Sequence, residues 1–284
     1  MADVNAVNRN VSIMLLPIVR QRVLIFSGNC VIIRKNKACG DSFAWLRFDT
    51  AMTITVSLGE IPVELLLNHG DYLPTYSQFA TAQPPLGQVC AFPDAQRHYP
   101  TLAQDSPYAE HMELCLRLSD FLLDYGRVFF HGVAFVWREK AWILTAPPET
   151  GKTTLFLFWK LCCGDAVRIL NGDKPILALD DGTFTVHPSP WNGKENLGNL
   201  ISAPLGGIVL LKRGAQNRME RVLHGAAVPI YSQFLYSAIK PAALDAVCAM
   251  EDALLRTVPV WELTSCGDLD SAELCRAGLE EVLP

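Results

Sequence analysis

The feature that most constrains the fold is an apolar run, a polar loop and a second apolar run between residues 141 and 163. Residues 141–145 (AWILT) are typical of a buried strand, and residues 155–163 (LFLFWKLCC) are typical of a helix that packs on a sheet. The loop between them reads APPETGKTT and matches the pattern G-x-x-x-x-G-K-[ST], except that Ala146 stands in the first glycine position. This strand, loop and helix in succession predict an α/β fold.

The loop also carries the residue types that a phosphate needs. Backbone N–H groups at the start of a helix point toward an anion, and the helix dipole adds a favourable potential. Gly151 would let the backbone approach the phosphates, Lys152 would contact the β- and γ-phosphates, and Thr153 would hold Mg²⁺ through its hydroxyl. The alternative is a chance match at an ordinary strand–helix turn. We expect a nucleotide phosphate site formed by Ala146, Glu149, Thr150, Gly151, Lys152, Thr153 and Thr154.

A second polar turn lies about twenty residues after Lys152. A short apolar run at 167–170 ends at Asn171-Gly172-Asp173. A carboxylate at a strand end beside a phosphate loop can hold Mg²⁺ or accept a proton from an attacking hydroxyl, so Asp173 is a candidate for both roles. The alternative is an ordinary Asn-Gly hairpin turn with a solvated aspartate.

Two further segments carry candidate residues. Residues 187–196 (HPSPWNGKEN) are either a structural loop or a source of Lys194 for a phosphate and of Trp191 for a wall of the site. His131 lies within an apolar strand, where a histidine is either a core residue or a group near the phosphates. The pair Asp180-Asp181 is expected to form a solvated hairpin turn rather than a metal site.

The chain divides into two parts by its residue composition and by the secondary structure that its patterns predict. Residues 12–67 are rich in short β-favouring runs, and residues 71–107 are rich in Pro, Gln, Ser and Tyr, which predicts a connector with one strand near 87–92. We therefore expect a β-rich N-terminal domain with its connector over 1–107 and a core domain over 108–284. In the core domain we expect helices at 110–125, 244–255 and 271–282, strands at 128–136, 141–145 and 258–263, and a hairpin of 176–179 with 183–186.

Composition excludes several classes of protein. The chain has 284 residues, of which 50% are hydrophobic and 19% charged, so it can bury a sizeable core and disorder is not expected. A net charge of −5 without a long basic run disfavours nucleic acid or an anionic membrane as partner, and no apolar stretch is long enough to span a bilayer. The nine cysteines form no C-x-x-C pair, and the N-terminus lacks a signal-peptide layout, which predicts buried, reduced thiols and a cytoplasmic protein.

Taken in order, these segments resemble the HPr serine kinase/phosphorylase family, and more closely its relatives with a phosphoenolpyruvate-carboxykinase-type nucleotide core. The resemblance covers roughly residues 110–284. It is carried by His131-Gly132-Val133, Gly151-Lys152-Thr153-Thr154, Asn171-Gly172-Asp173-Lys174-Pro175, Pro190-Trp191-Asn192-Gly193-Lys194-Glu195 and Gly207-Ile208-Val209-Leu210-Leu211. The resemblance implies a mixed β-sheet with a P-loop, in which Lys152 and Thr153 bind ATP and Mg²⁺. It further implies that Asp173 is the catalytic base near the metal and that His131 lies near the phosphates.

The chain departs from the family pattern at four places. Ala146 replaces the first loop glycine, Glu149 stands where a small residue is usual, and Gly172 stands where HPr kinases have a second acid. A segment matching the HPr-binding region is also not recognised. The leading expectation is an Mg-ATP-dependent kinase that phosphorylates a hydroxyl of a small protein, peptide or small molecule.

A catalytically degenerate relative that binds nucleotide or peptide as a recognition subunit is the alternative. Phosphorylase or phosphatase activity at the same site is a weaker third reading. The hydrophobic content leaves room for a homo-oligomer interface.

Overall fold

The computed structural model describes residues 22–26, 29–33, 52–91, 106–222, 227–236 and 241–283. Two compact units divide between Arg47 and Phe48. In the first unit, β1 (Arg22–Phe26) pairs antiparallel with β2 (Asn29–Ile33), in agreement with the short β-favouring runs found over residues 12–67. The expected boundary between residues 107 and 108 stays a prediction.

A small sheet opens the second unit. β3 (Met52–Leu58) pairs antiparallel with β4 (Ile61–Leu67), and β5 (Gln88–Cys90) pairs parallel with β4, within the segment where one strand was expected. The short helix α1 (Leu73–Ser77) lies in the segment expected to be a connector. Residues 92–105 of that connector lie outside the described residues.

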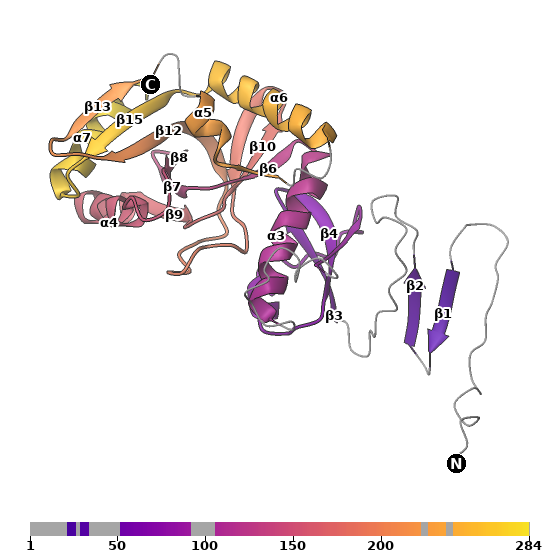
Figure 1. Cartoon of the computed structure of the whole chain (residues 1–284). Helices are drawn as coiled ribbons and strands as arrows, with labels where there is room; N and C mark the ends of the chain where they lie inside the picture. Colours follow the sequence, from indigo (N-terminus) through magenta and orange to yellow (C-terminus); the bar gives the residue numbers. More distant parts are fainter. Residues whose placement is uncertain are drawn as a thin grey trace, which may run out of the picture. The chain divides into compact units, whose positions relative to one another are not determined.

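Helix α3 (Pro107–Leu123) covers the small sheet (Figure 1). Its start is set by Ser106, whose Oγ accepts a hydrogen bond from the Ala109 amide, and by a proline in the first turn. Its apolar stripe packs against the small sheet and also against the edge of the large one. The shared core contains Val56, Leu58, Val63, Leu65, Leu114, Leu118, Leu122, Phe129, Ile176 and Trp191.

The second sheet is large and mixed, which confirms the predicted mixed α/β fold. Its strand order is β14-β6-β10-β11-β12-β8-β7-β9, with β15 paired to β12 and β13 paired to β15. The β8–β12 and β12–β15 pairs are parallel, and the others are antiparallel. The strands are β6 (Arg127–Phe130), β7 (Val133–Trp137), β8 (Lys140–Thr145), β9 (Val167–Asn171), β10 (Ile176–Asp180), β11 (Thr183–His187), β12 (Ala203–Arg213), β13 (Arg218–Arg221), β14 (Phe234–Leu235) and β15 (Val260–Ser265).

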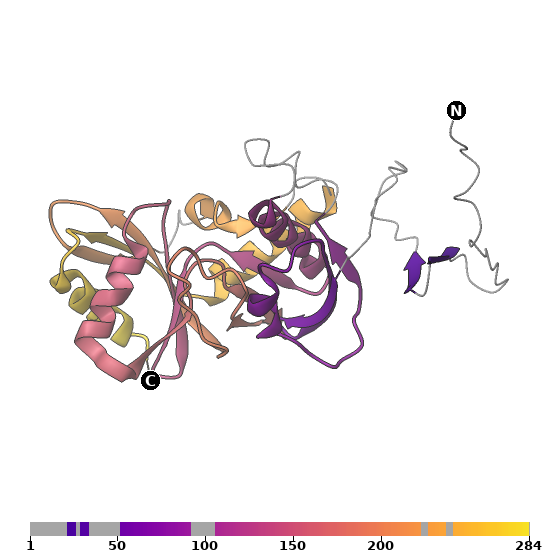
Figure 2. The same cartoon turned by 90° about the horizontal axis from the view of Figure 1, so that it is seen from below.

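Helices cover both faces of this sheet (Figures 1 and 2). The elements are α4 (Lys152–Cys163), the 3₁₀ turn η1 (Gly164–Ala166), α5 (Ala227–Tyr231), α6 (Pro241–Thr257) and α7 (Leu269–Glu280). The helices expected at 244–255 and 271–282 are thus confirmed as α6 and α7. The predicted turn at Asp180-Asp181 is also confirmed, since β10 and β11 form a hairpin there.

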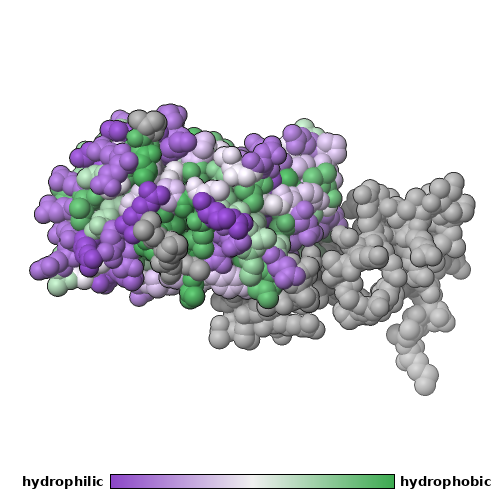
Figure 3. All heavy atoms as spheres, turned by 90° about the horizontal axis from the view of Figure 1, so that it is seen from above, coloured by the Kyte–Doolittle hydropathy of each residue, from purple (hydrophilic) through white to green (hydrophobic). Residues whose placement is uncertain are grey.

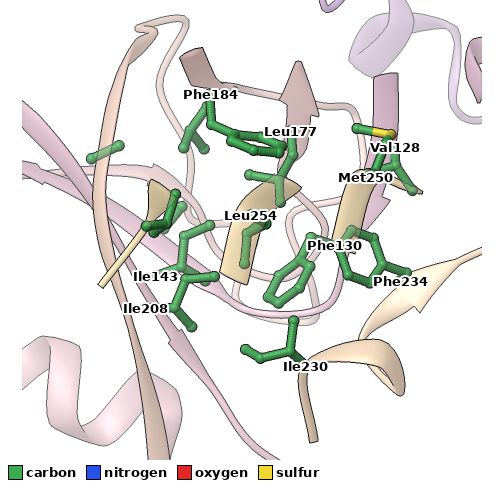
Figure 4. Close-up of a cluster of buried hydrophobic side chains, with 14 of the residues drawn as sticks. Val128, Phe130, Ile143, Leu177, Phe184, Ile208, Ile230, Phe234, Met250 and Leu254 are labelled. Atoms are coloured by element: carbon green, nitrogen blue, oxygen red, sulfur yellow. The ribbon is translucent and has the colours of Figure 1, made fainter. Parts of the chain in front are cut away.

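Alternation along each strand sends side chains to opposite faces. On β8, Trp142 and Leu144 pack with helices α4 and α7, whereas Ala141 and Ile143 pack on the α6 side. Figure 4 shows part of the hydrophobic cluster on the α6 side of the sheet, where Ile143 and Ile208 from the strands lie near Leu254 of α6. Both faces of the central strands are therefore buried, which is why their sequences are continuous apolar runs.

The surface carries the remaining polar residues. The face drawn in Figure 3 is mainly hydrophilic, with apolar residues scattered among polar ones. Within the described residues, no helix combines the length and apolar character that crossing a membrane requires. The cysteines whose side chains the structure describes are free thiols: Cys90, Cys115, Cys162, Cys163, Cys248, Cys266 and Cys275. Of these, Cys115 and Cys275 are buried, whereas Cys162, Cys248 and Cys266 are exposed, so the prediction of buried thiols is wrong for the exposed three. The side chains of Cys30 and Cys39 lie outside the described part of the chain.

Substitution of Leu118 by alanine tests the core that α3 shares with both sheets. The Leu118 side chain is fully buried, so we expect Leu118→Ala to lower the free energy of unfolding by about 2–5 kcal/mol. Leu161→Ala is the matched control because Leu161 is 74% exposed, and its cost should stay within about 0.5 kcal/mol. Urea unfolding of both variants measures the difference. Equal effects would contradict the shared core.

Candidate phosphate-binding site

The predicted loop lies at the end of β8, and helix α4 begins directly after it. Gly151 is the N-cap residue of α4 and has φ +106°, a conformation that residues with a side chain rarely adopt. The amides of the first helical turn have no acceptor within the helix, and Gly151 has no side chain to cap them. The glycine of the motif is therefore required by the backbone, and the helix start it creates offers donors to an anion.

Lys152 folds back over the loop. Its Nζ donates to the carbonyl oxygens of Ala146 at 2.9 Å and Pro147 at 3.2 Å. Thr150 Oγ1 also donates to the Pro147 carbonyl at 2.8 Å. Burial lowers the pKa of the Lys152 ammonium, with Lys174 acting in the same direction and Asp173 in the opposite one. The ammonium thus lies within electrostatic range of the second predicted turn.

That second turn is built around the side chain of Asn171, which is fully buried at the end of β9. Asn171 Oδ1 accepts from the amides of Asp173 at 2.9 Å and Lys174 at 2.7 Å. Its Nδ2 donates to the Ser189 carbonyl at 3.1 Å and to Asn192 Oδ1 at 2.9 Å. One amide side chain therefore fixes both the turn and the neighbouring loop, and this sets the position of the Asp173 carboxylate.

Asp173 lies among nitrogen groups. Its Oδ1 is 3.5 Å from His131 Nε2, and its Oδ2 accepts a hydrogen bond from the ammonium of Lys174. The Asp173 carbonyl also accepts from the Gly132 amide at 2.8 Å, which joins the turn to the start of β7. The structure therefore places His131 beside Asp173, with Lys152 near enough for its charge to act on the pKa of His131.

Gln233 orients the imidazole of His131. Gln233 Nε2 donates to the Pro229 carbonyl at 3.2 Å, so Gln233 Oε1 is the atom that faces His131 Nδ1 at 3.1 Å. An amide oxygen only accepts, which assigns the proton to Nδ1 and leaves Nε2 toward Asp173. Burial, and next the charge of Lys152, lower the pKa of His131, while Asp173 and Gln233 raise it.

The other predicted residues are less closely joined to this cluster. Thr153 is half-buried in the first turn of α4, and Thr154 and Lys194 are exposed. The loop that carries Lys194 does reach the turn, since a Cβ added at Gly193 would lie 3.2 Å from Asp173 Cβ.

The metal roles of Thr153 and Asp173 stay predictions. Hydroxyl and carboxylate oxygens are donors that suit Mg²⁺. Among the described residues no group of three His, Cys, Asp or Glu side chains is arranged to hold a metal ion.

Trp191 takes the structural role that the sequence left open. Its ring is buried, stacks on His111 with centroids 5.0 Å apart and meets Phe129 edge-on at 5.3 Å. Its Nε1 donates to the His111 carbonyl at 3.1 Å. Burial lowers the pKa of His111 to about 4, so this ring is neutral near pH 7. Trp191 is thus part of the core beneath the site.

Sequence reasoning missed three residues of the site. Lys174 follows Asp173 directly, and a lysine beside a candidate carboxylate was the available signal. Arg213 ends β12 and donates to the Glu149 carbonyl from Nη2 at 2.6 Å and to the Thr150 carbonyl from Nε at 3.1 Å. Gln233 is 102 residues from His131 and lies in a segment with no recognisable pattern.

A hollow of about 460 Å³ beside the loop is lined by Pro147, Glu149, Thr150, Leu211, Lys212 and Arg213.

Among known proteins, this chain has matches in solved structures. No family model matches the chain, and no curated protein matches it. The HPr(Ser) kinase/phosphatase from Coxiella burnetii matches with a TM-score of 0.25 and 10% sequence identity, over 45% of this chain and 97% of that chain. A likeness of this size carries no argument about the site, and the function must be inferred from the chain's own residues.

Substitution of Asn171 by alanine tests the foundation of the Asp173 turn. It leaves the Asp173 amide without its acceptor, leaves the Lys174 amide with the Trp191 carbonyl alone, and takes a donor from the Ser189 carbonyl, the Ser189 hydroxyl and Asn192 Oδ1, so we expect a loss of about 2–4 kcal/mol in the free energy of unfolding. Asn199→Ala is the control, because Asn199 makes one exposed hydrogen bond to the Ile169 carbonyl. Its expected cost is below about 1 kcal/mol. Chemical denaturation of both variants decides, and comparable losses would show that the turn does not depend on Asn171.

Proposed function

We propose that this chain is an Mg-ATP-dependent kinase that transfers a phosphoryl group to a hydroxyl of a small protein, a peptide or a small molecule. The observation that carries the proposal is that Lys152, at a helix start with free amide donors, lies within electrostatic range of the paired Asp173 carboxylate and His131 imidazole. A phosphate-binding loop and a candidate base thus lie within electrostatic range of each other, although 21 residues separate Lys152 from Asp173 in the chain.

Binding of the triphosphate would use the first turn of α4. The amides there would donate to phosphate oxygens, and Lys152 would exchange its hydrogen bonds to two loop carbonyls for the β- and γ-phosphates. Mg²⁺, when bound, would neutralise charge on the phosphates, and the Thr153 hydroxyl and an Asp173 oxygen would be its protein ligands. These roles use the chain's own donors and acceptors.

Transfer would need Asp173 as base. The acceptor hydroxyl gives its proton to the Asp173 carboxylate while its oxygen forms a bond to the γ-phosphorus, and the bond from that phosphorus to the β-phosphate oxygen breaks. Lys152 and Lys174 would offset the negative charge on the transferred group and on the leaving diphosphate. His131, oriented by Gln233, would lie against Asp173, and its doubly protonated form, with a proton on Nε2 as well as on Nδ1, would donate to that carboxylate.

A second candidate function is binding of nucleotide without transfer. It is favoured by the hydrogen bond from Lys174 to Asp173, which occupies an oxygen that a base or a metal ligand needs. Gly172 precedes Asp173, so no second acid stands beside it in sequence. In this case the site would serve recognition, and the chain would act as a subunit that senses nucleotide or peptide.

Substitution of Lys152 by alanine tests the phosphate site. We expect Mg-ATP to bind with micromolar affinity to the unmodified chain and at least about 100-fold more weakly to Lys152→Ala, because the ammonium pairs directly with phosphate. Lys160→Ala is the matched control, since Lys160 lies in the same helix about 12 Å farther along its axis. Calorimetric titration measures all three proteins. Equal affinity for the two lysine variants would contradict the phosphate site.

Substitution of Asp173 by asparagine separates transfer from binding. We expect Asp173→Asn to keep Mg-ATP affinity within about tenfold while ADP formation with a hydroxyl acceptor falls by a factor of about 10²–10⁴, because the amide cannot take the proton. Radiolabelled γ-phosphate transfer to a panel of serine peptides and small alcohols measures the rate. Unchanged turnover in this variant would remove Asp173 from the chemistry. Tight binding with no transfer to any acceptor or to water by the unmodified chain would favour the second candidate.

A further inference from the structure

Arg213 reaches the phosphate loop from a different strand. It is the last residue of β12, and its guanidinium donates to two successive loop carbonyls, those of Glu149 and Thr150, at 2.6 and 3.1 Å. Its backbone is held by the parallel pairing of β12 with β15, where Arg213 lies opposite Ser265, and the next amide, of Gly214, donates to the Ser265 carbonyl at 3.1 Å. The Arg213 side chain, although exposed, is therefore attached to a fixed backbone and hydrogen-bonded to the loop.

The carbonyl groups of the loop are engaged almost from end to end. Lys152 holds the carbonyls of Ala146 and Pro147, Arg213 holds those of Glu149 and Thr150, and the carbonyl of Gly151 accepts from the Leu155 amide inside the helix. If Lys152 turns to a phosphate, the first two carbonyls lose this partner. The Thr150 hydroxyl would still donate to the Pro147 carbonyl from within the loop, and Arg213 would hold the Glu149 and Thr150 carbonyls from a different strand.

The direction of a carbonyl fixes the direction of the following amide. In a trans peptide the C=O and N–H bonds of one peptide unit point to opposite sides. Because the Glu149 and Thr150 carbonyls point to the guanidinium, the N–H groups of Thr150 and Gly151 point away from it. These are two of the amides that would line a phosphate site.

Glu149 has φ +62°, an unfavourable conformation for a residue with a side chain. The hydrogen bonds from Arg213 therefore help to hold the loop in this conformation.

We propose that Arg213 is a positioning residue, which holds the loop so that the amides of Thr150 and Gly151 face a bound phosphate chain. The proposal rests on the phosphate-binding role proposed for the loop. The guanidinium acts through geometry as well as charge, since its rigid planar fork fixes the directions of both hydrogen bonds, which an ammonium on a flexible stem does not. Its positive charge also adds to the potential that attracts an anion to the loop.

The first test needs no nucleotide. Amide hydrogen exchange of Leu155, whose N–H donates to the Gly151 carbonyl at 2.9 Å, is compared in the full chain between the unmodified protein, Arg213→Gln and Arg218→Gln. The control residue is also an exposed arginine, on β13, and pairs with Glu220 away from the loop. We expect exchange about tenfold faster in Arg213→Gln and unchanged in Arg218→Gln, because the loop loses its restraint while the core does not. Unchanged exchange in Arg213→Gln would overturn the proposal.

The second test uses Mg-ATP and inorganic tripolyphosphate as probes. We expect the affinity of Arg213→Gln for both to fall about tenfold, with a melting temperature within about 2 °C of the unmodified chain, because Arg213 is exposed. Arg213→Lys should recover only part of the affinity, and full recovery would reduce the role of Arg213 to charge alone and overturn the positioning role. If the unmodified chain binds neither probe while the exchange result holds, the proposed function fails and the restraint of the loop by Arg213 stands.

Discussion

The pairing of β8 with β7 on one side and with β12 on the other determines where the groups of the candidate site lie. β8 and β12 are parallel, with Thr145 opposite Leu210, so both strands end at the same edge of the sheet. β7 is antiparallel to β8 and begins at that edge, and β9, antiparallel to β7, ends there with Asn171 opposite Ala134. The phosphate loop, the Asp173 turn, His131 and Arg213 are therefore brought together by strand register rather than by loop packing.

The electrostatic balance of this edge is positive and is organised around one carboxylate. Two ammonium groups, an imidazole and the start of a helix surround Asp173. The pKa of Lys152 is lowered mainly by burial, which means that the fold supports a charged lysine at some cost in the absence of an anion. A phosphate group would offset that cost, because it supplies the negative charge that a single aspartate does not.

Local patterns explain why part of the site could be predicted from the sequence. The Gly151-Lys152-Thr153 segment is recognisable because its backbone requirement, its charge and its hydroxyl follow one another in the chain. The Asp173 turn is recognisable because Asn-Gly marks a turn after an apolar strand. The hairpin at Asp180-Asp181 and the helices α6 and α7 were predicted on similar grounds, from turn residues and from apolar periodicity.

Long-range contacts explain what the sequence did not reveal. Arg213 bonds Glu149 across 64 residues of sequence, and Gln233 bonds His131 across 102. No local sequence pattern at either residue indicates its distant partner. Trp191 could be assigned to the core only once α3 had placed His111 beside it, 80 residues earlier in the chain. The helix α1 escaped notice because its five residues are too few to show a helical period and include a proline.

The buried ring of Trp191 has a consequence for protein engineering. The Trp191 carbonyl accepts from the amide of Lys174 at 3.1 Å, and its ring lies in the core that α3 and the small sheet enclose. The wall behind the Asp173 turn is thus furnished by residues that precede the large sheet in the chain. An expression fragment trimmed to the large sheet would expose Trp191 to water and remove the residues that pack behind the Asp173 turn. The smallest useful fragment therefore includes residues 52–91.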